Sequence, residues 1–218
     1  MSVLADTAAA PFGMPMDDGR IFAHLLVDQF EARIGSPTAF RWDAQAWVGT
    51  DENRFYLLTE GEAQKGSVRD GQHELLYDHP ISAFFDVQAG IRSDADSARN
   101  RTWAALGFAG LAPYFLELSA TAYASDSGHY AARAMASYDL LLTQRLVLTP
   151  MAELNFYSKA DPRRELDSGL SGLEAGLRVR YEITRKFAPY LGVSFERRSA
   201  PAGTVNDTRI ALGIRAWL

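Results

Sequence analysis

The chain has 218 residues, of which 47% are hydrophobic and 22% charged, and its formal net charge at pH 7 is −5. This negative charge argues against nucleic acid as a partner, and the absence of cysteine excludes disulfide scaffolds and metal sites built on thiolates. No stretch approaches the roughly 18 uninterrupted apolar residues that a membrane-spanning helix requires, which excludes helical insertion into a membrane.

Residues 1–20 are rich in Ala, Pro, Gly and Asp and lack hydrophobic periodicity, so we expect a flexible N-terminal tail. The first residues, MSVLADTAAAPFG, have neither the basic start nor the apolar centre of a signal peptide. An outer-membrane location, which the strands described next favour, therefore requires that a leader has been removed. Otherwise that location is wrong.

From residue 21 onward, polar and apolar residues alternate in segments that are separated by polar turns, which is typical of β-strands. The first segment, Phe22–Ile34, does not define its inward face. Its polar residues indicate two different parities, with Gln29, Glu31 and Arg33 on one and His24 and Asp28 on the other. Six segments with clearer alternation follow, beginning near Phe40, Phe55, Gln72, Phe85, Thr102 and Leu116.

The stretch Tyr130–Tyr157 predicts a hairpin that folds back about Thr143. In this register one face of the hairpin is apolar and the other is polar, as strand alternation requires. Pro150 cannot donate to the ladder and marks a candidate bulge. The register places two inward pairs directly opposite each other, Arg133–Glu153 and Met135–Met151.

Three further strands begin near Leu173, Tyr190 and Arg209, which gives 12 strands, with ten as the alternative count. Bacterial single-chain barrels have an even number of strands. Short turns alternate with longer connections, which we place around residues 62–71, 93–101, 159–169 and 199–207. Because short turns belong on the periplasmic side, both termini are predicted to lie in the periplasm.

The polarity of the alternation identifies the kind of barrel. Strands that are apolar outside, charged inside and aromatic at their ends are typical of a membrane barrel, whereas a soluble barrel has the reverse polarity. The 12 Phe, 9 Tyr and 4 Trp are sufficient for interfacial girdles. We therefore predict an all-β fold, a transmembrane antiparallel up-and-down β-barrel over residues 21–218, with a polar lumen and no unpaired edge.

Charged residues on the inward face predict the content of the lumen. Either these charges neutralise each other and plug the barrel, or they line a polar path for a small cation or solute. Charges at membrane depth indicate function, but a wet barrel interior lowers their cost and weakens that argument. The predicted lumen charges are Arg41, Asp43, Glu60, Asp86, Arg92, Glu117, Arg133, Glu153, Arg178, Arg180, Glu182, Glu196 and Arg215.

Methionines are the candidate metal ligands. Thioether sulfur favours Cu(I) over hard cations, so the inward Met135 and Met151 predict a copper site. The alternative is that both side chains only fill space in a crowded lumen. The tail offers a second candidate site with Met14 and Met16, which lie beside two aspartates and near His24, although an inert tail is the alternative.

The sequence gives little support for an enzyme. A lipase in the outer membrane needs an outward-facing serine within hydrogen-bond reach of a histidine. Neither His73 nor His129 has a convincing serine partner on its own face, and the motif G-x-S-x-G is absent. We therefore predict no catalytic residues.

Most of residues 20–198 is similar to a known family. The similarity is carried by VDQFEAR, WDAQAWVGTDENRFYLLTEGE, DVQAGIR, RTWAALGFAGLAPYFLELSATAY, YDLLLTQRLVLTPMAELNFYSKADP and SGLSGLEAGLRVRYEITRKFAPYLGVSFER. These stretches resemble the copper resistance protein B family of bacterial outer-membrane barrels. The resemblance implies copper as the bound or transported ion, a place in the outer membrane among its lipids, and periplasmic copper-resistance proteins as partners.

The sequence departs from that family at its two ends. Family precursors usually carry an N-terminal region rich in Met, His and Asp, of which only Met14-Pro15-Met16-Asp17-Asp18 is present here, and the last residue is Leu218 instead of an aromatic residue. We predict an outer-membrane barrel of a copper-resistance system that binds copper, passes it across the membrane, or both. The alternative is a plugged structural barrel that anchors or docks a periplasmic copper-binding partner without transport of its own.

Overall fold

The fold was analysed in a computed structural model, which describes residues 20–95, 100–162, 164, 166–200 and 203–218. Residues 1–19 of the predicted tail, with Met14 and Met16, lie outside the described residues. No helix in the described part of the chain is long and apolar enough to span a membrane.

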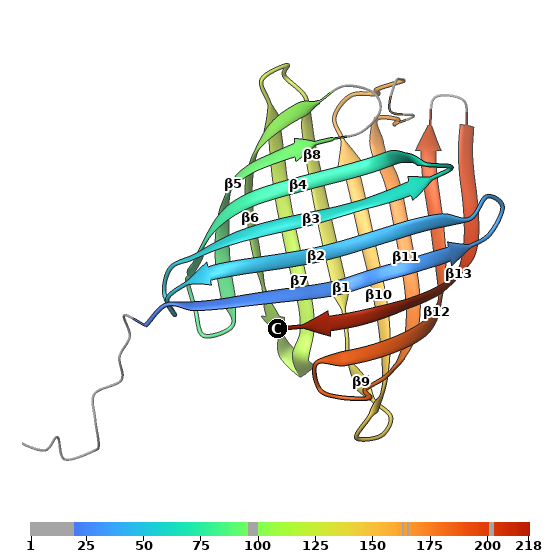
Figure 1. The fold of residues 1–218 in the computed structure, drawn as a ribbon. Helices are drawn as coiled ribbons and strands as arrows, with labels where there is room; N and C mark the ends of the chain where they lie inside the picture. Colours follow the sequence, from blue (N-terminus) through green and yellow to red (C-terminus); the bar gives the residue numbers. More distant parts are fainter. Residues whose placement is uncertain (1–19, 96–99, 163, 165, 201–202) are drawn as a thin grey trace, which may run out of the picture.

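The described residues form one antiparallel sheet that closes on itself (Figure 1). Strands that follow each other in the sequence pair, except that β8 and β9 both pair with β10, and the ladder of β1 with β13 closes the ring. The strands are β1 Phe22–Ile34, β2 Ala39–Gly49, β3 Arg54–Gln64, β4 Ser67–Pro80, β5 Phe85–Asp94, β6 Arg101–Ala112, β7 Leu116–Ser125, β8 Tyr130–Ser137, β9 Leu140–Leu141, β10 Leu146–Tyr157, β11 Gly169–Tyr181, β12 Phe187–Ala200 and β13 Gly203–Trp217, with a 3-10 turn, η1, at Pro113–Phe115.

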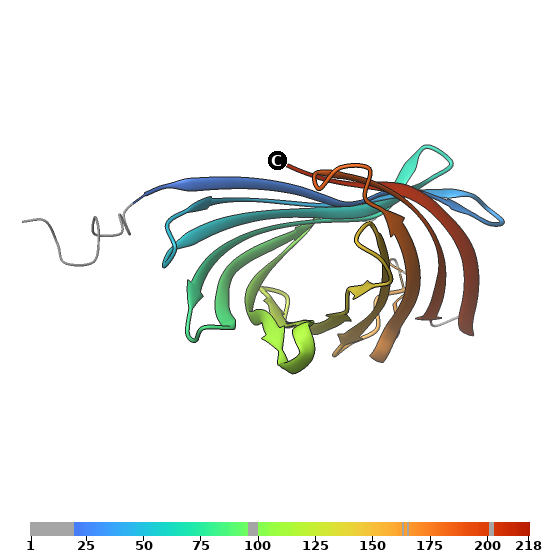
Figure 2. The same cartoon turned by 90° about the horizontal axis from the view of Figure 1, so that it is seen from below.

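The predicted 12-stranded barrel is confirmed. The two-residue β9 continues β8 beyond a short break and pairs with the same strand, β10, so the two segments count as one interrupted strand of the wall. Seen end-on, the strands surround a central lumen (Figure 2).

The polarity of the wall is that of a membrane barrel. On β11, Leu177 is 47% exposed, whereas the next residue, Arg178, is only 7% exposed. Outward apolar residues continue across neighbouring strands, as in the row Leu57, Leu75 and Ile91. Exposed aromatic rings flank this band at both ends of the strands, with Phe55, Tyr77, Phe108, Tyr181 and Phe187 at one end and Phe30, Tyr130, Phe156 and Phe195 at the other.

A β-bulge explains the two parities of the first strand. The register of β1 against β2 shifts between Val27 and Gln29, so Asp28 has no partner residue on β2. One extra residue reverses the alternation of every side chain that follows it. Residues on both sides of the bulge therefore reach the lumen, and the apparent conflict between His24 and Glu31 disappears.

The predicted register of the Tyr130–Tyr157 hairpin is wrong by two residues. Thr143 Oγ1 accepts hydrogen bonds from the backbone N–H groups of Arg145 and Leu146, at 3.3 and 2.9 Å, which centres the turn one residue later than expected. A shift of two residues keeps every side chain on its predicted face. It changes the partners, however: Arg133 lies opposite Asn155, Met135 opposite Glu153 and Met151 opposite Ser137.

Pro150 accounts for the break between β8 and β9. The Tyr138 N–H donates to the Pro150 carbonyl at 3.1 Å, but proline has no N–H for the return bond of this pair. The ladder is therefore interrupted at Tyr138 and Asp139, opposite the proline. The missing donor thus breaks the partner strand rather than β10 itself.

Two of the predicted long connections are strands. β3 runs to Gln64 and β4 begins at Ser67, and the two residues between them, Lys65 and Gly66, have φ values of 51° and 81°. Positive φ at both central positions is typical of the type I′ turn of a tight hairpin. The ladder between β12 and β13 likewise reaches Ala200 and Gly203. The sequence predicts loops at the tips of the β3–β4 and β12–β13 hairpins because neither face of the hairpin is apolar there.

We predict that Pro150→Val stabilises the barrel. Position 150 belongs to the apolar outward face. Valine supplies a backbone N–H for the Tyr138 carbonyl, and this added hydrogen bond is worth about 0.5–1.5 kcal/mol of stability. The urea midpoint of unfolding from lipid vesicles, followed by tryptophan fluorescence, should rise. An unchanged or lower midpoint would show that the missing hydrogen bond does not limit the stability of this hairpin.

Candidate functional site in the barrel lumen

Ten charged side chains form one connected network across the middle of the lumen. We call it the charge belt. It contains five arginines and five glutamates, whose formal charges cancel. The less buried Asp207 joins this network through Arg209 at 2.6 Å and is not counted in the belt. Its members are Glu31, Arg33, Arg41, Glu60, Glu62, Arg133, Glu153, Glu174, Arg178 and Arg209.

The centre of the charge belt is the pair Glu31 and Arg33 on β1, which are 0% and 1% exposed. The carboxylate of Glu31 accepts hydrogen bonds from Arg33 Nε at 2.7 Å, Arg178 Nε at 3.2 Å and the Tyr190 hydroxyl at 2.8 Å. Burying a charge is tolerable only when it is paired and hydrogen-bonded. Three donors around one carboxylate meet that condition.

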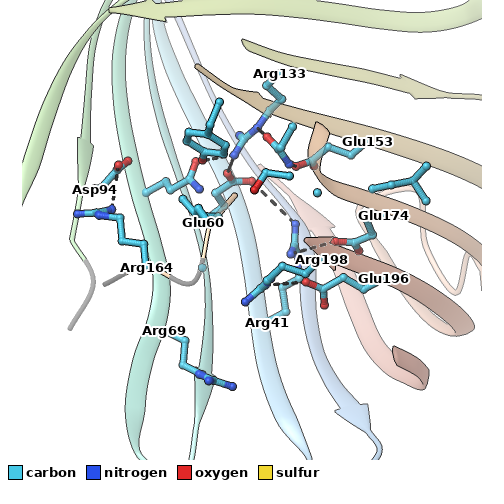
Figure 3. A pocket seen from close by; sticks show the side chains of 18 of the residues that line it. Arg41, Glu60, Arg69, Asp94, Arg133, Glu153, Arg164, Glu174, Glu196 and Arg198 are labelled. Atoms are coloured by element: carbon cyan, nitrogen blue, oxygen red, sulfur yellow. Dashed lines mark hydrogen bonds and ion pairs between the residues drawn. The ribbon is translucent and has the colours of Figure 1, made fainter. Parts of the chain in front are cut away.

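The charge belt bridges walls of the barrel that are distant in the sheet. Arg33 on β1 lies 2.5 Å from Glu174 on β11, although two strands separate β1 from β11. Arg133 on β8 pairs with Glu60 on β3 across four intervening strands (Figure 3). These side chains therefore cross the lumen and divide it into two compartments.

The smaller compartment has a volume of about 100 Å³ and lies on the side of the belt away from the chain ends. Ion pairs also line this compartment: Asp94 accepts from Arg92 Nε at 2.7 Å and from Arg164 Nη1 at 3.1 Å (Figure 3). Arg164 belongs to the connection between β10 and β11, which is also tied to the wall by the 2.7 Å pair of Arg101 with Asp161.

The larger compartment, which we call the chamber, has a volume of about 540 Å³ and lies on the side of the chain ends. Leu25 and Leu218 exchange two backbone hydrogen bonds at this end of the barrel. Seven carboxylates and four guanidinium groups line the chamber, a formal surplus of three negative charges; they are Asp28, Asp43, Glu60, Glu74, Glu117, Asp139 and Glu153, and Arg133, Arg178, Arg180 and Arg215.

The sequence profile of a family described as "Copper resistance protein B precursor (CopB)" matches residues 21–218. The chain belongs to the copper resistance protein B family. It is 42% identical over 216 residues to the copper resistance protein B homolog of Pseudomonas syringae pv. tomato, covering 94% of this chain and 73% of that protein. It is 42% identical over 186 residues to copper resistance protein B of Escherichia coli, covering 85% of this chain but only 63% of that relative.

Solved structures place the fold among the outer-membrane porins. The NanC porin superposes with a TM-score of 0.62 at 14% sequence identity, covering 88% of this chain and 98% of that one. The KdgM porin gives a TM-score of 0.54 at 13% identity with the same coverage. At these identities the similarity establishes the fold and nothing about the ligand.

The 13 lumen charges predicted from the sequence lie in different places in this family member, and 11 of them belong to the charge belt or line one of the two compartments. Arg41, Glu60, Arg133, Glu153 and Arg178 belong to the charge belt; Asp43, Glu117, Arg180 and Arg215 line the chamber; Arg92 and Glu196 line the smaller compartment. The remaining two sit in local pairs, Asp86 with Arg54 at 3.5 Å and Glu182 with Arg180 at 3.8 Å.

Sequence reasoning missed the centre of the charge belt for two physical reasons. The bulge at Asp28 hid the inward direction of Glu31 and Arg33, and Glu62 lies in a segment that was expected to be a loop. Alternation alone indicates that Glu174 and Arg209 face inward, but it carries no sign of the partner across the lumen.

The two predicted copper ligands of the barrel both line the chamber, although they are not opposite each other. Met151 is 8% exposed, and its sulfur accepts a contact from Arg178 Nη1. A glycine at position 176 leaves room for this side chain, because an added Cβ there would come within 3.0 Å of Met151 Cγ. Met135 is 37% exposed, so it is the more accessible thioether.

The histidines are held by other contacts. His24 lies between Trp47 and Trp217, with ring centroids 6.1 and 5.7 Å away. His73 Nδ1 contacts Thr59 Oγ1 at 3.0 Å. Within the described residues, no group of three or more His, Cys, Asp or Glu side chains could hold a metal ion.

His129 does have a serine partner, contrary to expectation. Its Nδ1 lies 3.1 Å from Ser127 Oγ, two residues away in the exposed turn between β7 and β8. A catalytic histidine also needs an acid that orients it. Among the described residues no carboxylate bonds to the His129 ring, so this contact is that of a turn.

We predict that Arg33→Met destabilises the barrel by about 2–4 kcal/mol, because it leaves Glu31 and Glu174 buried without their central partner. Arg197→Met is the matched control, since Arg197 is exposed and should change stability by less than about 0.5 kcal/mol. Urea unfolding in lipid vesicles measures both. Equal effects of the two substitutions would mean that the charge belt is not a stabilising element.

Proposed function

We propose that this protein is the outer-membrane barrel of a copper-resistance system and that it binds copper in the chamber. Membership of the copper resistance protein B family supports a role in copper handling. The single observation that supports the chamber as the copper site is that both methionines of the barrel line it. Thioethers are ligands for Cu(I). Copper is here the bound substrate, and no catalytic step is assigned.

The chamber is proposed to face the periplasm. The described chain begins, at Arg20, and ends, at Leu218, at the chamber's end of the barrel, and the connections there are short, such as residues 50–53, 81–84 and 113–115. The longest connection, residues 158–168, lies at the opposite end. Bacterial barrels have short periplasmic turns and longer extracellular loops, which supports this orientation. Periplasmic copper-resistance proteins would then be the partners that exchange copper with the chamber.

The charge belt favours binding over free passage. Its cross-lumen pairs separate the chamber from the other end of the barrel, so an ion that enters from the periplasm meets paired guanidinium groups. A second candidate function is regulated passage, in which these pairs separate. The two candidates differ in whether the resting barrel conducts ions.

The first experiment is Cu(I) binding to the detergent-purified full chain. The sequence has five methionines and no cysteine, so the effect of a methionine substitution on Cu(I) binding is not masked by thiolate ligands. We expect Met135→Leu/Met151→Leu to weaken Cu(I) binding at least tenfold in competition with a chromogenic Cu(I) chelator. Met14→Leu/Met16→Leu is the matched control and should retain the chamber site.

The reverse result, loss of binding only in the tail variant, would make the barrel an anchor for a copper-binding arm. Equal binding by both variants and the wild type would remove methionine from the site. A wild-type chain that binds no Cu(I) would refute the proposal that this protein binds copper.

The second experiment is conductance in planar lipid bilayers. We expect no steady channels from the wild-type chain and measurable ionic current from Arg33→Ser/Arg133→Ser, which removes two of the cross-lumen bridges. Arg197→Ser controls for the loss of an arginine outside the belt. Steady current through the wild type would favour passage over one-sided binding.

A further inference from the structure

The chamber is larger than a bare copper ion needs. A water molecule occupies about 30 Å³, whereas pockets for small organic ligands measure about 300–1,000 Å³. At about 540 Å³, the chamber falls within the second range. Its size therefore points to a ligand with an organic part.

Part of the chamber wall is apolar, which is unusual for the polar interior of a membrane barrel. In the strand register, Leu26 on β1, Gln45 on β2 and Leu58 on β3 form one inward row. Tyr56 lies one inward position nearer the chain ends, next to Leu76 on β4. Leu26, Leu58, Tyr56 and Leu76 together form an apolar surface around Gln45. None of these side chains takes part in the ion pairs of the charge belt.

The next inward row toward the charge belt carries a carboxyl group without a bonded partner. Gln29, Asp43 and Glu60 are neighbours in the register, directly beyond Leu26, Gln45 and Leu58. Within the described residues, Asp43 makes neither an ion pair nor a hydrogen bond with a side chain, whereas Glu60 is bound by Arg133. An apolar surface thus lies beside a carboxyl group without a bonded partner, in a chamber with a formal surplus of negative charge.

The lumen already holds cations on aromatic rings. The guanidinium of Arg92 lies 4.7 Å from the ring centroid of Tyr123, and that of Arg178 lies 5.7 Å from the ring of Tyr190. Tyr56, the third tyrosine that lines the chamber, has no such cation over its ring in the described part of the structure. Tyrosine rings attract cations through their quadrupole, so the Tyr56 ring, which also contacts Trp47 with ring centroids 6.2 Å apart, is a further aromatic partner.

We propose that the chamber binds a small organic cation that has an apolar or aromatic part. The cationic group lies at Asp43, and the apolar part lies on Leu26, Leu58 and Tyr56. This inference goes beyond copper binding and does not rest on it, because none of these four residues is a proposed copper ligand.

The test uses two water-soluble probes of similar shape and opposite charge, benzyltrimethylammonium and benzylsulfonate. Binding to the full chain in an uncharged detergent is measured by calorimetry and by saturation-transfer NMR. We expect the cation to bind at least tenfold more tightly than the anion. Equal binding of the two probes would overturn the proposal.

Two substitutions test the position of the ligand. At a pH at which the Asp43 carboxyl is ionised, Asp43→Asn should weaken binding of the cation about fivefold, the effect of one unit charge at about 4 Å in a water-like medium. Asp51→Asn makes the same charge change in the exposed turn between β2 and β3 and should leave binding unchanged. If Asp51→Asn weakened binding of the cation more than Asp43→Asn did, the ligand would lie outside the chamber.

A third substitution removes the space itself. Ser119 lines the chamber, and Ser119→Trp should abolish cation binding while the barrel keeps its heat-modifiable migration on gels, which reports folding. Retained binding in this folded variant would overturn the proposal. Met135→Leu/Met151→Leu should still bind the cation, so failure of the copper site and failure of this inference can be distinguished.

Discussion

Every backbone donor and acceptor in a membrane-spanning wall must find its partner within the protein, because the lipid core offers none. The ladder between β1 and β13 meets this requirement by joining the first strand to the last. Once the sheet is closed, a side chain can point only to lipid or to the lumen. The exposed row of Leu57, Leu75 and Ile91 and the buried pair of Glu31 and Arg33 are two consequences of that single constraint.

The charges inside the closed wall have few partners except each other. Arg33 reaches Glu174 and Arg133 reaches Glu60 because the lumen is narrow enough for side chains of opposite walls to meet. The resulting belt is electrically balanced and divides the lumen into unequal compartments. Separation of the chamber from the far end of the barrel is the feature on which the proposed one-sided binding of copper depends.

The chamber combines properties that suit different ligands. Its methionines offer soft sulfur, but the Met151 sulfur is already contacted by Arg178, which leaves Met135 as the more accessible ligand. Its other wall combines apolar surface with the unpaired Asp43. A fold does not by itself determine a ligand, so the contents of the chamber must be argued from these residues and not from the porin-like fold.

The sequence by itself determined the class of fold and the 12 strands. It also predicted an inward direction for Arg133 and Glu153 that a shift of register by two residues leaves unchanged, because side chains alternate with a period of two. It did not determine the partners. The Met135–Met151 pairing failed because the turn is centred one residue later than Thr143, and the facing of Glu31 stayed open because the bulge at Asp28 reverses the alternation. Only the tertiary structure decided which charges meet across the lumen, since curvature and closure of the sheet, which no local pattern encodes, bring β1 to β11 and β3 to β8.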